Sequence, residues 1–329
     1  MNNPLVSIIM TAYNEELYIK EAIESVLAQT YTDFEFIIVN DGSIDQTESI
    51  ILSFSDDRIK YVKNEHNLKL IDSLNIGLNL AKGKYIARMD SDDLCMPERL
   101  EKQIEFMEAN PEIGISGAQL IVFGSHDGFM NYPLTHDDIR LKLFISSCFG
   151  NNVVMFRRVI FEKNQLFFPL GYFHAEDFKC WTNWMSVTKA ANLNLYLVKY
   201  RSHANSVSSK HKLIQRETRN RIRLEYVKTT FSLENDLKTA VDFTGKISSA
   251  RVNAIKTIFK INEEKKHFDV LKLKKTVMKL WYLDSLEEVE NNFFVILKYP
   301  LIFKIDLKSN FKNWINIVKH FLKFKLAGK

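Results

Sequence analysis

The chain has 329 residues, 46% of them hydrophobic, which is enough to bury the core of one large domain or two smaller ones. The net charge of +5 is uneven, because residues 291–329 hold eight lysines against one acid, Asp306. The rest of the chain is therefore slightly acidic, which excludes a broad basic surface for nucleic acid.

Targeting signals and a disulfide framework are both missing from the sequence. No apolar run reaches the roughly 18 to 20 residues of a membrane span. The N-terminus, MNNPLVSIIM, lacks the charged start and cleavage site of a signal peptide. Cys95, Cys148 and Cys180 are far apart and odd in number, which favours reduced thiols. We therefore expect a cytoplasmic protein.

The first 125 residues alternate strand-like and helix-like segments. Strands are expected at 6–10, 34–40, 59–62 and 84–89, and each is followed by a helical segment. Asn14 is expected to cap the first helix, and Pro97 to begin the fourth. This alternation predicts an α/β fold with a mostly parallel sheet covered by helices on both sides. TAYNE, NDGS and MDSDD fall at the carboxyl ends of strands, where such sheets bind ligands.

The remaining sequence suggests two further segments. Residues 126–205 are less regular, with one clear helix in HAEDFKCWTNWMS, and residues 206–329 read as charged helices. At the C-terminus one helical face gathers Phe311, Trp314, Ile315, Val318 and Leu322, with lysines away from its centre. This tail could pack on the protein itself or bind an anionic bilayer, and the sequence leaves both open.

The stretch ARMDSDD places Asp90, Asp92 and Asp93 together at the end of a strand. An aspartate there is often only a turn former, and Asp93 could be that. Three crowded carboxylates repel one another, and a divalent cation would relieve the repulsion. Oxygen ligands suit Mg²⁺ or Mn²⁺, which complete their coordination with phosphate oxygens and water.

Other polar residues have both a structural and a functional interpretation. Asp41 could form an Asx turn or accept a hydrogen bond from a base or ribose. Tyr13 could stack on a base, and Glu15 could bind ribose hydroxyls. Arg88 and Arg201 could balance a diphosphate or form ordinary ion pairs. No P-loop or dinucleotide-binding motif occurs.

Two candidates lie in the second half of the chain. Glu176 and Asp177 open the aromatic helix, where acids are favoured by the helix dipole alone. One of them could instead be a general base held by the packed helix. His203, in YRSHANSVSS, could be an ordinary hydrogen-bonded histidine or a contact to metal or phosphate.

The motifs VSIIMTAYNEE, FIIVNDGSIDQT, GKYIARMDSDD, AEDFKCW and YRSHANSVSS, in this order, resemble the inverting glycosyltransferases of family 2, which have the GT-A Rossmann-like fold. The resemblance covers residues 4 to 210. SLNIGL, NNVVMFRR and VKYRSHANSVSSK look more narrowly like bacterial β-1,3-N-acetylglucosaminyltransferases that extend lipooligosaccharide.

The resemblance implies a role for each segment. Residues 1–125 would form the nucleotide-sugar-binding half of the GT-A domain, 126–205 the acceptor-binding and catalytic-base half, and 206–329 a helical extension with a basic amphipathic tail. The donor would be a UDP-sugar, best UDP-GlcNAc, with UDP-Gal, UDP-GalNAc and UDP-Glc as alternatives. The acceptor would be an oligosaccharide or lipid-linked glycan, extended by a β-1,3 linkage to galactose. The tail, 291–329, could contact the cytoplasmic face of the inner membrane.

The resemblance also assigns residues. Asp177 would be the catalytic base, with Glu176 orienting the acceptor or the base. The donor contacts would be Thr11, Ala12, Tyr13, Glu15, Asp41, Arg88 and Asp90, with Asp41 reading the uracil edge. Asp92 would bind Mn²⁺ or Mg²⁺, and Asp90 would contact the sugar or ribose as well as the metal region. His203 is a further candidate metal contact, on its own residue chemistry. One departure is HNLKL (66–70), where relatives often carry a glycine after the asparagine.

Three other classes fit the sequence less well. A phosphotransferase of the haloacid dehalogenase type would carry its DxD near the first strand. A nucleotidyltransferase would show a Gly-rich basic loop where TAYNEE is acidic. A catalytically silent sugar-nucleotide binder would not need intact Asp90, Asp92 and Asp177.

Overall fold

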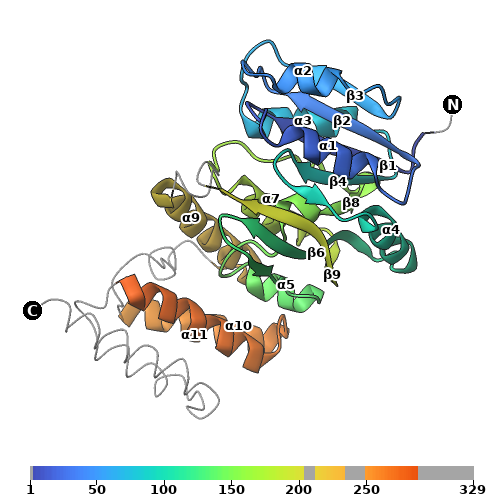
Figure 1. Cartoon of the computed structure of the whole chain (residues 1–329). Helices are drawn as coiled ribbons and strands as arrows, with labels where there is room; N and C mark the ends of the chain where they lie inside the picture. Colours follow the sequence, from blue (N-terminus) through green and yellow to red (C-terminus); the bar gives the residue numbers. More distant parts are fainter. Residues whose placement is uncertain (1–2, 204–211, 234–248, 288–329) are drawn as a thin grey trace, which may run out of the picture. The chain divides into compact units, whose positions relative to one another are not determined.

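The computed structural model describes residues 3–203, 212–233 and 249–287, and the chain divides into two compact units (Figure 1). The first unit comprises residues 1–140 and 147–218, and the second comprises 141–146 and 219–329. The expected amphipathic tail at 291–329 lies outside the described residues. The candidate site residues all belong to the first unit.

Strands and helices alternate through the first third of the chain, as the sequence predicts. The strands are β1 (Val6–Ala12), β2 (Phe34–Asn40), β3 (Ile59–Lys63), β4 (Tyr85–Asp90) and the short β5 (Leu94–Cys95). The helices are α1 (Ile19–Leu27), α2 (Thr47–Leu52), α3 (Leu70–Leu80) and α4 (Arg99–Ala109). Strand β1 pairs in parallel with β2 and β4, and β2 pairs in parallel with β3.

The second half of this unit extends the same sheet. Its elements are β6 (Ile113–Gly124), β7 (Gly128–Met130), α5 (His136–Lys142), the 3₁₀ helix η1 (Asn151–Val153), β8 (Met155–Arg157), α6 (Arg158–Asn164), α7 (Glu176–Trp184) and β9 (Lys189–Ser202). The strand order is β3-β2-β1-β4-β8-β6-β9-β5, with β7 paired to β6.

The expectation of a mostly parallel sheet holds for β1 to β4 and is only approximate for the whole. Strand β8 enters antiparallel between β4 and β6, and β5 and β7 are also antiparallel to their partners. The long strands β6 and β9 are parallel to each other. The added antiparallel strands are short, and β7 follows β6 through a brief connection that needs no crossover helix.

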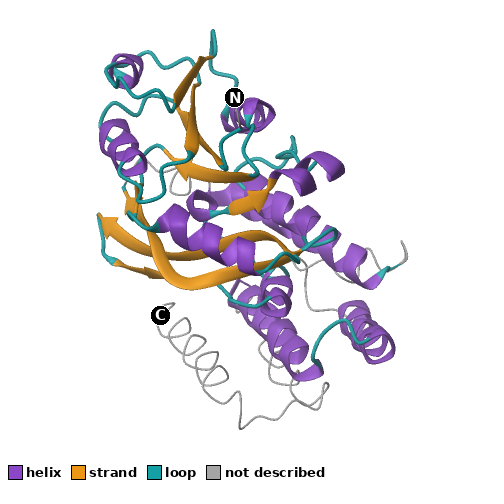
Figure 2. Cartoon of the chain, turned by 90° about the vertical axis from the view of Figure 1, so that its right-hand side faces the viewer, coloured by secondary structure: helices purple, strands orange, loops and turns teal. Residues whose placement is uncertain are grey.

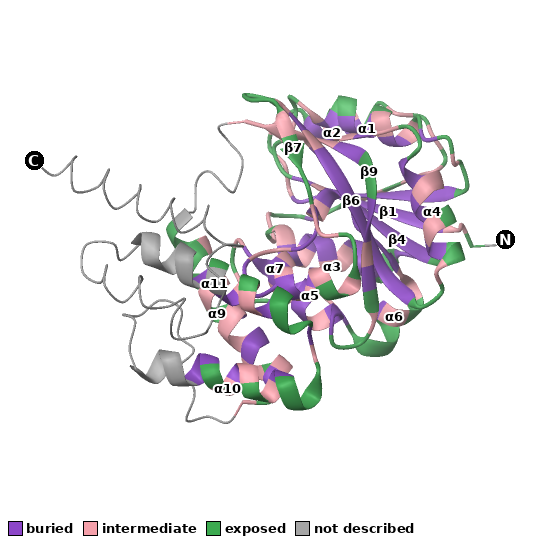
Figure 3. Cartoon of the chain, turned by 90° about the horizontal axis from the view of Figure 1, so that it is seen from below, coloured by how far each residue is buried: buried purple, intermediate pink, exposed green. Residues whose placement is uncertain are grey.

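Helices cover both faces of this sheet (Figure 2). Figure 3 shows α1 and α2 on one side of the strands and α3, α6 and α7 on the other. Every residue of β2 is accordingly buried, and in β1 only Thr11 is partly exposed. Continuous apolar strands of this kind are what a sheet with two covered faces requires.

Two helices begin later than the sequence predicts. Helix α1 begins at Ile19, and Asn14 has a φ of 56° and does not cap it. The side chain of Asn14 instead accepts a hydrogen bond from the amide of Ile44, so it links two loops. Helix α4 begins at Arg99, and Pro97 lies in the preceding turn.

The described part of the second unit is helical, as predicted. It contains the end of α9 (Lys212–Phe231), together with α10 (Ser249–Lys265) and α11 (Val270–Glu287). The ring of Phe144 contacts the rings of Tyr226, Phe231 and Phe268, and these four side chains form an aromatic cluster in the second unit. Among the described helices of the chain, none combines the length and apolar character that crossing a bilayer demands.

Candidate active site

The ends of three neighbouring strands meet at one edge of the sheet. Thr11 lies opposite Asp90 in the pairing of β1 with β4, and Ala12 lies opposite Asn40 in the pairing with β2. The amide of Asp41 donates to the carbonyl of Ala12 at 2.8 Å. The fold thus gathers the predicted donor-binding residues of TAYNE, NDGS and the DxD at the same edge.

Asp90 lies against a buried arginine. The Arg88 guanidinium contacts the Asp90 carboxylate at 2.8 Å through Nη2, while Arg88 Nε and Nη1 are buried without a hydrogen-bond partner. Burial raises the pKa of Asp90; Arg88 opposes this rise, and the carboxylates of Asp92 and Asp177 add to it. Arg88 therefore lies inside the site, and its Nε and Nη1 groups could still donate hydrogen bonds to a ligand.

Asp92 lies beside His203, the residue that follows β9. Asp92 Oδ2 and His203 Nε2 are 2.9 Å apart, and the buried Nδ1 of His203 has no hydrogen-bond partner. The structure therefore brings together two of the three residues expected as metal ligands and pairs the third, Asp90, with Arg88. In the described ranges, no group of three or more His, Cys, Asp or Glu residues is arranged to hold a metal ion.

A carboxylate and an imidazole still fit a divalent cation. Mg²⁺ in particular takes few protein ligands and fills its coordination with phosphate oxygens and water. Both side chains are largely shielded from solvent, with exposed fractions of 22% for Asp92 and 16% for His203. This donor set is therefore chemically suited to Mn²⁺ or Mg²⁺ bound together with a diphosphate.

Asp93 and Arg201 hold the DxD turn against β9. The buried carboxylate of Asp93 accepts hydrogen bonds from the Arg201 amide and from the side chain of Asn152. Arg201 Nε donates to the carbonyl of Asp92 at 2.8 Å, and Nη2 contacts Glu21 at 2.6 Å. Asp93 thus shapes the turn, and the Arg201 guanidinium, a candidate for the diphosphate, is already engaged within the protein.

Sequence reasoning missed Asn152 and Arg99 as supports of this turn. Arg99 is fully buried and donates from Nη2 to the carbonyl of Arg88 at 2.6 Å. Its charge also lowers the pKa of Asp90. Neither residue stands out in the sequence, because the contacts that tie it to the turn, Asn152 to Asp93 and Arg99 to the Arg88 carbonyl, join residues that are 59 and 11 positions apart.

Asp41 fixes a neighbouring loop. Its buried carboxylate accepts hydrogen bonds from the Asn64 side chain at 2.9 Å and from the amides of Leu68 and Lys69 at 2.8 and 2.9 Å. The next residue, Gly42, has a φ of 69°, and a Cβ there would lie 2.7 Å from the backbone of His66. The residue expected to read uracil therefore also positions the loop that would border the base.

Tyr13 and Glu15 extend from the end of β1. Tyr13 is exposed, as a ring available for stacking should be. The amide of Glu15 donates to Thr47 Oγ1 at 2.7 Å, which fixes the backbone here. Burial, followed by the charges of Asp92 and Asp90, raises the pKa of Glu15 to about 8. Glu15 thus belongs to the same electrostatic cluster as the DxD.

Glu176 and Asp177 occupy the first turn of α7. Trp181 and Trp184 are fully buried behind them, and Trp181 packs on Phe149. Burial, together with the charge of Asp177, raises the pKa of Glu176 to about 7. Because Asp177 also raises the pKa of Asp90, the fold brings the acidic pair of α7 close to the DxD turn.

The sequence of this chain is similar to those of known glycosyltransferases. The model of glycosyl transferase family 2 matches residues 7–175. An uncharacterized glycosyltransferase of Haemophilus influenzae is 34% identical, covering 98% of each chain. The Escherichia coli protein WfaP, a UDP-Glc:alpha-D-GlcNAc-diphosphoundecaprenol beta-1,3-glucosyltransferase, is 36% identical over 62% of this chain and 80% of its own.

A solved structure shares the fold. Residues 1–349 of S. aureus TarS align with a TM-score of 0.59 at 19% identity, covering 90% of this chain and 91% of that one. The same protein in complex with UDP-GlcNAc aligns with a TM-score of 0.57. The fold, the family match and the relative that spans nearly the whole length show that this chain belongs to glycosyltransferase family 2 and has the GT-A fold.

Proposed function

We propose that the protein transfers a hexose or N-acetylhexosamine from a UDP-sugar to a hydroxyl of a glycan acceptor, with inversion at the anomeric carbon. The product would be a β-linked glycan of the cell surface. The observation that carries this proposal is the DxD turn at the carboxyl edge of the sheet, where Asp92 lies 2.9 Å from His203 and Asp90 lies 2.8 Å from Arg88. The charge of Asp177 on α7 also raises the pKa of Asp90. A cation there would stabilise the departing diphosphate, and a separate carboxylate would take the proton of the acceptor hydroxyl.

Asp92 and His203 are the residues that would hold the divalent cation, with Asp90 two residues before Asp92 in the same turn. When bound, the cation supplies Lewis-acid stabilisation of the negative charge that develops on the departing UDP. Arg88 keeps the Asp90 carboxylate in place from within the protein. Thr11, Ala12, Tyr13, Glu15 and Asp41 would hold the uridine at the neighbouring strand ends.

Asp177 would act as the base. As the acceptor oxygen forms a bond to the anomeric carbon, the bond from that carbon to the UDP oxygen breaks, and Asp177 takes the hydroxyl proton. A positioned base typically contributes about 10²- to 10⁴-fold to the rate. Attack from the face opposite UDP converts an α-linked donor into a β-linked product. Glu176, with a pKa of about 7, would orient the acceptor or Asp177.

Beyond the general reaction, we also propose a particular donor sugar and a particular linkage to the acceptor. We favour UDP-GlcNAc as donor and a β-1,3 linkage to galactose, on the resemblance of the sequence to lipooligosaccharide transferases. WfaP, which is named as a β-1,3-glucosyltransferase that uses UDP-Glc, supports the linkage and makes UDP-Glc the main alternative. Its lipid-diphosphate acceptor also supports a lipid-linked glycan for this chain.

A donor-by-acceptor panel tests this proposal. The purified protein is incubated with Mn²⁺ or Mg²⁺, each of UDP-GlcNAc, UDP-Glc, UDP-Gal and UDP-GalNAc, and β-galactoside or GlcNAc-terminated acceptors. Products are read by mass spectrometry and their anomeric configuration by NMR. We expect one donor to dominate and the product to be β-linked. Donor binding without any product would favour a silent sugar-nucleotide binder.

A further inference from the structure

The motif SLNIGL, residues 73–78, lies on α3, and three of its residues connect this helix to other parts of the first unit. Ser73 Oγ accepts a hydrogen bond from the Asn64 side chain at 2.9 Å. A Cβ at Gly77 would lie 2.5 Å from the Ile9 side chain, so glycine lets α3 pack closely on β1. Ser73 and Gly77 are both buried and one turn apart, and they therefore lie together on the face of α3 that meets the sheet.

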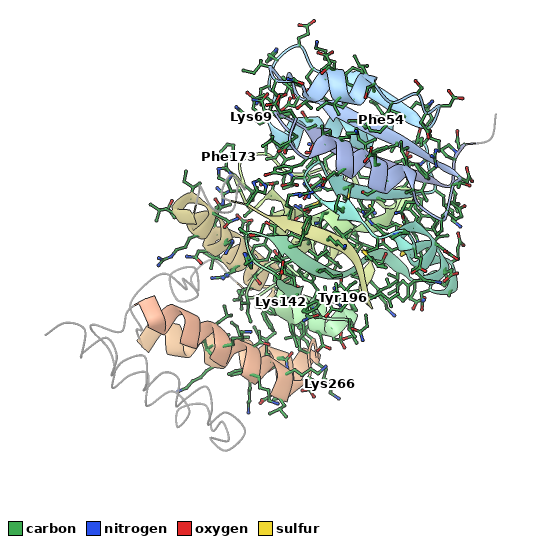
Figure 4. All side chains as sticks on the ribbon, viewed as in Figure 1. Phe54, Lys69, Lys142, Phe173, Tyr196 and Lys266 are labelled. Atoms are coloured by element: carbon green, nitrogen blue, oxygen red, sulfur yellow. The ribbon has the colours of Figure 1, made fainter. Side chains whose placement is uncertain are left out.

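The beginning of α3 is tied to the residue expected to read uracil. Lys69, labelled in Figure 4, is the last residue before the helix, and its amide donates to Asp41 Oδ2 at 2.9 Å. The Asn64 side chain donates to Asp41 Oδ1 as well as to Ser73, each at 2.9 Å. The same carboxylate that would contact uracil therefore also holds α3 in place.

Asn75 connects α3 to the loop before α7. An asparagine amide has both donors and an acceptor, and Asn75 uses both kinds on the backbone of Phe168. Its Nδ2 donates to the Phe168 carbonyl and its Oδ1 accepts from the Phe168 amide, both at 3.0 Å, although the residues are 93 positions apart. Asn75 is two residues from Ser73 and from Gly77, so it leaves the helix on a different side. This pair of hydrogen bonds fixes both the position and the orientation of Phe168.

Phe168 in turn packs against the helix that carries the proposed base. Its ring meets that of Trp181 edge to face, with 5.9 Å between the centroids. Trp181 is fully buried and follows Asp177 by four residues, so the two side chains share one face of α7. The Arg88 guanidinium, which pairs with Asp90, lies 5.9 Å from the centroid of the Phe168 ring. Phe168 therefore contacts both the helix of the base and the arginine that holds the DxD.

We infer that Asn75 is a positioning residue for the transfer step: by fixing Phe168 it holds the face of α7 that carries Asp177 in register with the DxD turn. This inference rests on the proposed function, in which Asp177 takes the acceptor proton. Ser73 and Gly77 hold α3 to the sheet independently of Asn75, so the donor site keeps its shape when the contact to Phe168 is lost. The rate of transfer then depends on Asn75 more strongly than donor affinity does.

Asn75→Ala tests the inference, with Asn79→Ala as the matched control, because Asn79 is exposed one turn later on α3. Alanine is the best helix former, so both substitutions suit the helix. We expect Asn75→Ala to lower the turnover number about 10- to 10²-fold, the usual cost of a misalignment of about 1 Å. Donor affinity and binding stoichiometry, measured by calorimetry, should match wild type. Equal turnover numbers in the two variants would overturn the inference.

A double variant separates positioning from a general structural effect. If Asn75 acts through the base, Asn75→Ala should cost almost nothing further in an Asp177→Asn background, because the effects of residues that act as a unit do not add. An undiminished loss in that background would overturn the inference alone. Should Asn75→Ala fail to bind the donor, Asn75→Asp, which keeps an acceptor for the Phe168 amide, is measured by the same criteria. Wild-type turnover by Asp177→Asn on its own would instead refute the proposed base, and the inference with it.

Discussion

Lys69 adopts a backbone conformation that side chains rarely take. Its φ of 78° and ψ of 163° lie in a region occupied almost only by glycine. The conformation aims the amide of Lys69 at Asp41 Oδ2, 2.9 Å away, where it helps to hold the loop beside the expected uridine site. In this loop, HNLKL (66–70), the sequence lacks the glycine that relatives often carry after the asparagine. The structure shows that Lys69 is the residue that takes the strained conformation.

Lys69→Gly should therefore stabilise the protein. Relief of the strain is worth about 1–3 kcal/mol, and the extra freedom of glycine in the unfolded chain offsets about 0.5–1 kcal/mol. We expect a net gain of about 1 kcal/mol in the free energy of unfolding, measured in urea. Lys69→Ala is the control, since it removes the same charge and keeps the strain. A glycine variant no more stable than the alanine variant would contradict this account of Lys69.

Glu15 makes stability depend on pH. Its pKa is raised from 4.5 to about 8, so the folded chain retains a proton that the unfolded chain loses in this range. The folded state binds more protons, and stability therefore falls as the pH rises from about 4.5 to about 8. Without metal, Glu15→Gln should match wild type near pH 4 and exceed it at pH 9. Thermal unfolding at the two pH values checks this, and parallel curves for the two proteins would refute it.

The DxD turn and β9 act as one element, although the residues that join them are 108 to 111 positions apart in the chain. Asp93 and Arg201 join the turn to the strand, and this junction places Asp92 beside His203. The Arg201 guanidinium also lies over the rings of Tyr18 and Phe123, each 4.6 Å from the centroid. The proposed metal ligands Asp92 and His203 are thus positioned by contacts that would supply no ligand atom themselves.

Arg201→Gln should loosen this junction. We expect a loss of about 1.5–3 kcal/mol in stability, the usual value for a hydrogen-bonded charge. We also expect a higher Mn²⁺ concentration for half-maximal UDP release. Glu21→Gln is the control, because it removes only the ion pair at a carboxylate that is 60% exposed and should cost at most about 1 kcal/mol. If both variants needed the same Mn²⁺ concentration, Arg201 would not position the ligands.

Local patterns in the sequence predicted the elements of the first 109 residues well. Apolar runs at strand or helix spacing decide those elements, so β1 to β4 and the inward face of α1 appear as expected. Asn14 was predicted wrongly, because a cap motif cannot reveal a partner such as Ile44, 30 residues away. The mixed pairing of β8 was missed for a similar reason, since three residues carry little periodic signal.

At the scale of the molecule, the sequence predicted which motifs converge but not how their charges are compensated. The alternation of strands and helices predicted that TAYNE, NDGS and the DxD meet at one edge of the sheet, where the strand pairing puts them. The role of the acidic pair on α7 came from the family resemblance and stays a prediction. The pairing of Asp90 with Arg88, and the burial of Arg99 beneath the same strand, depend on three-dimensional packing. The first unit carries every candidate site residue, although the described chain continues into a helical second unit.

The central claim is that Asp177 is the base of a sugar transfer, and Asp177→Asn tests it most directly. The measurement is product formation by mass spectrometry with the preferred donor, alongside UDP-sugar affinity from calorimetry. Asp57→Asn, an exposed carboxylate on another loop, is the matched control. We predict that Asp177→Asn lowers the turnover number by about 10²- to 10⁴-fold with nearly unchanged donor affinity. Turnover at the wild-type rate would contradict the assignment of the base.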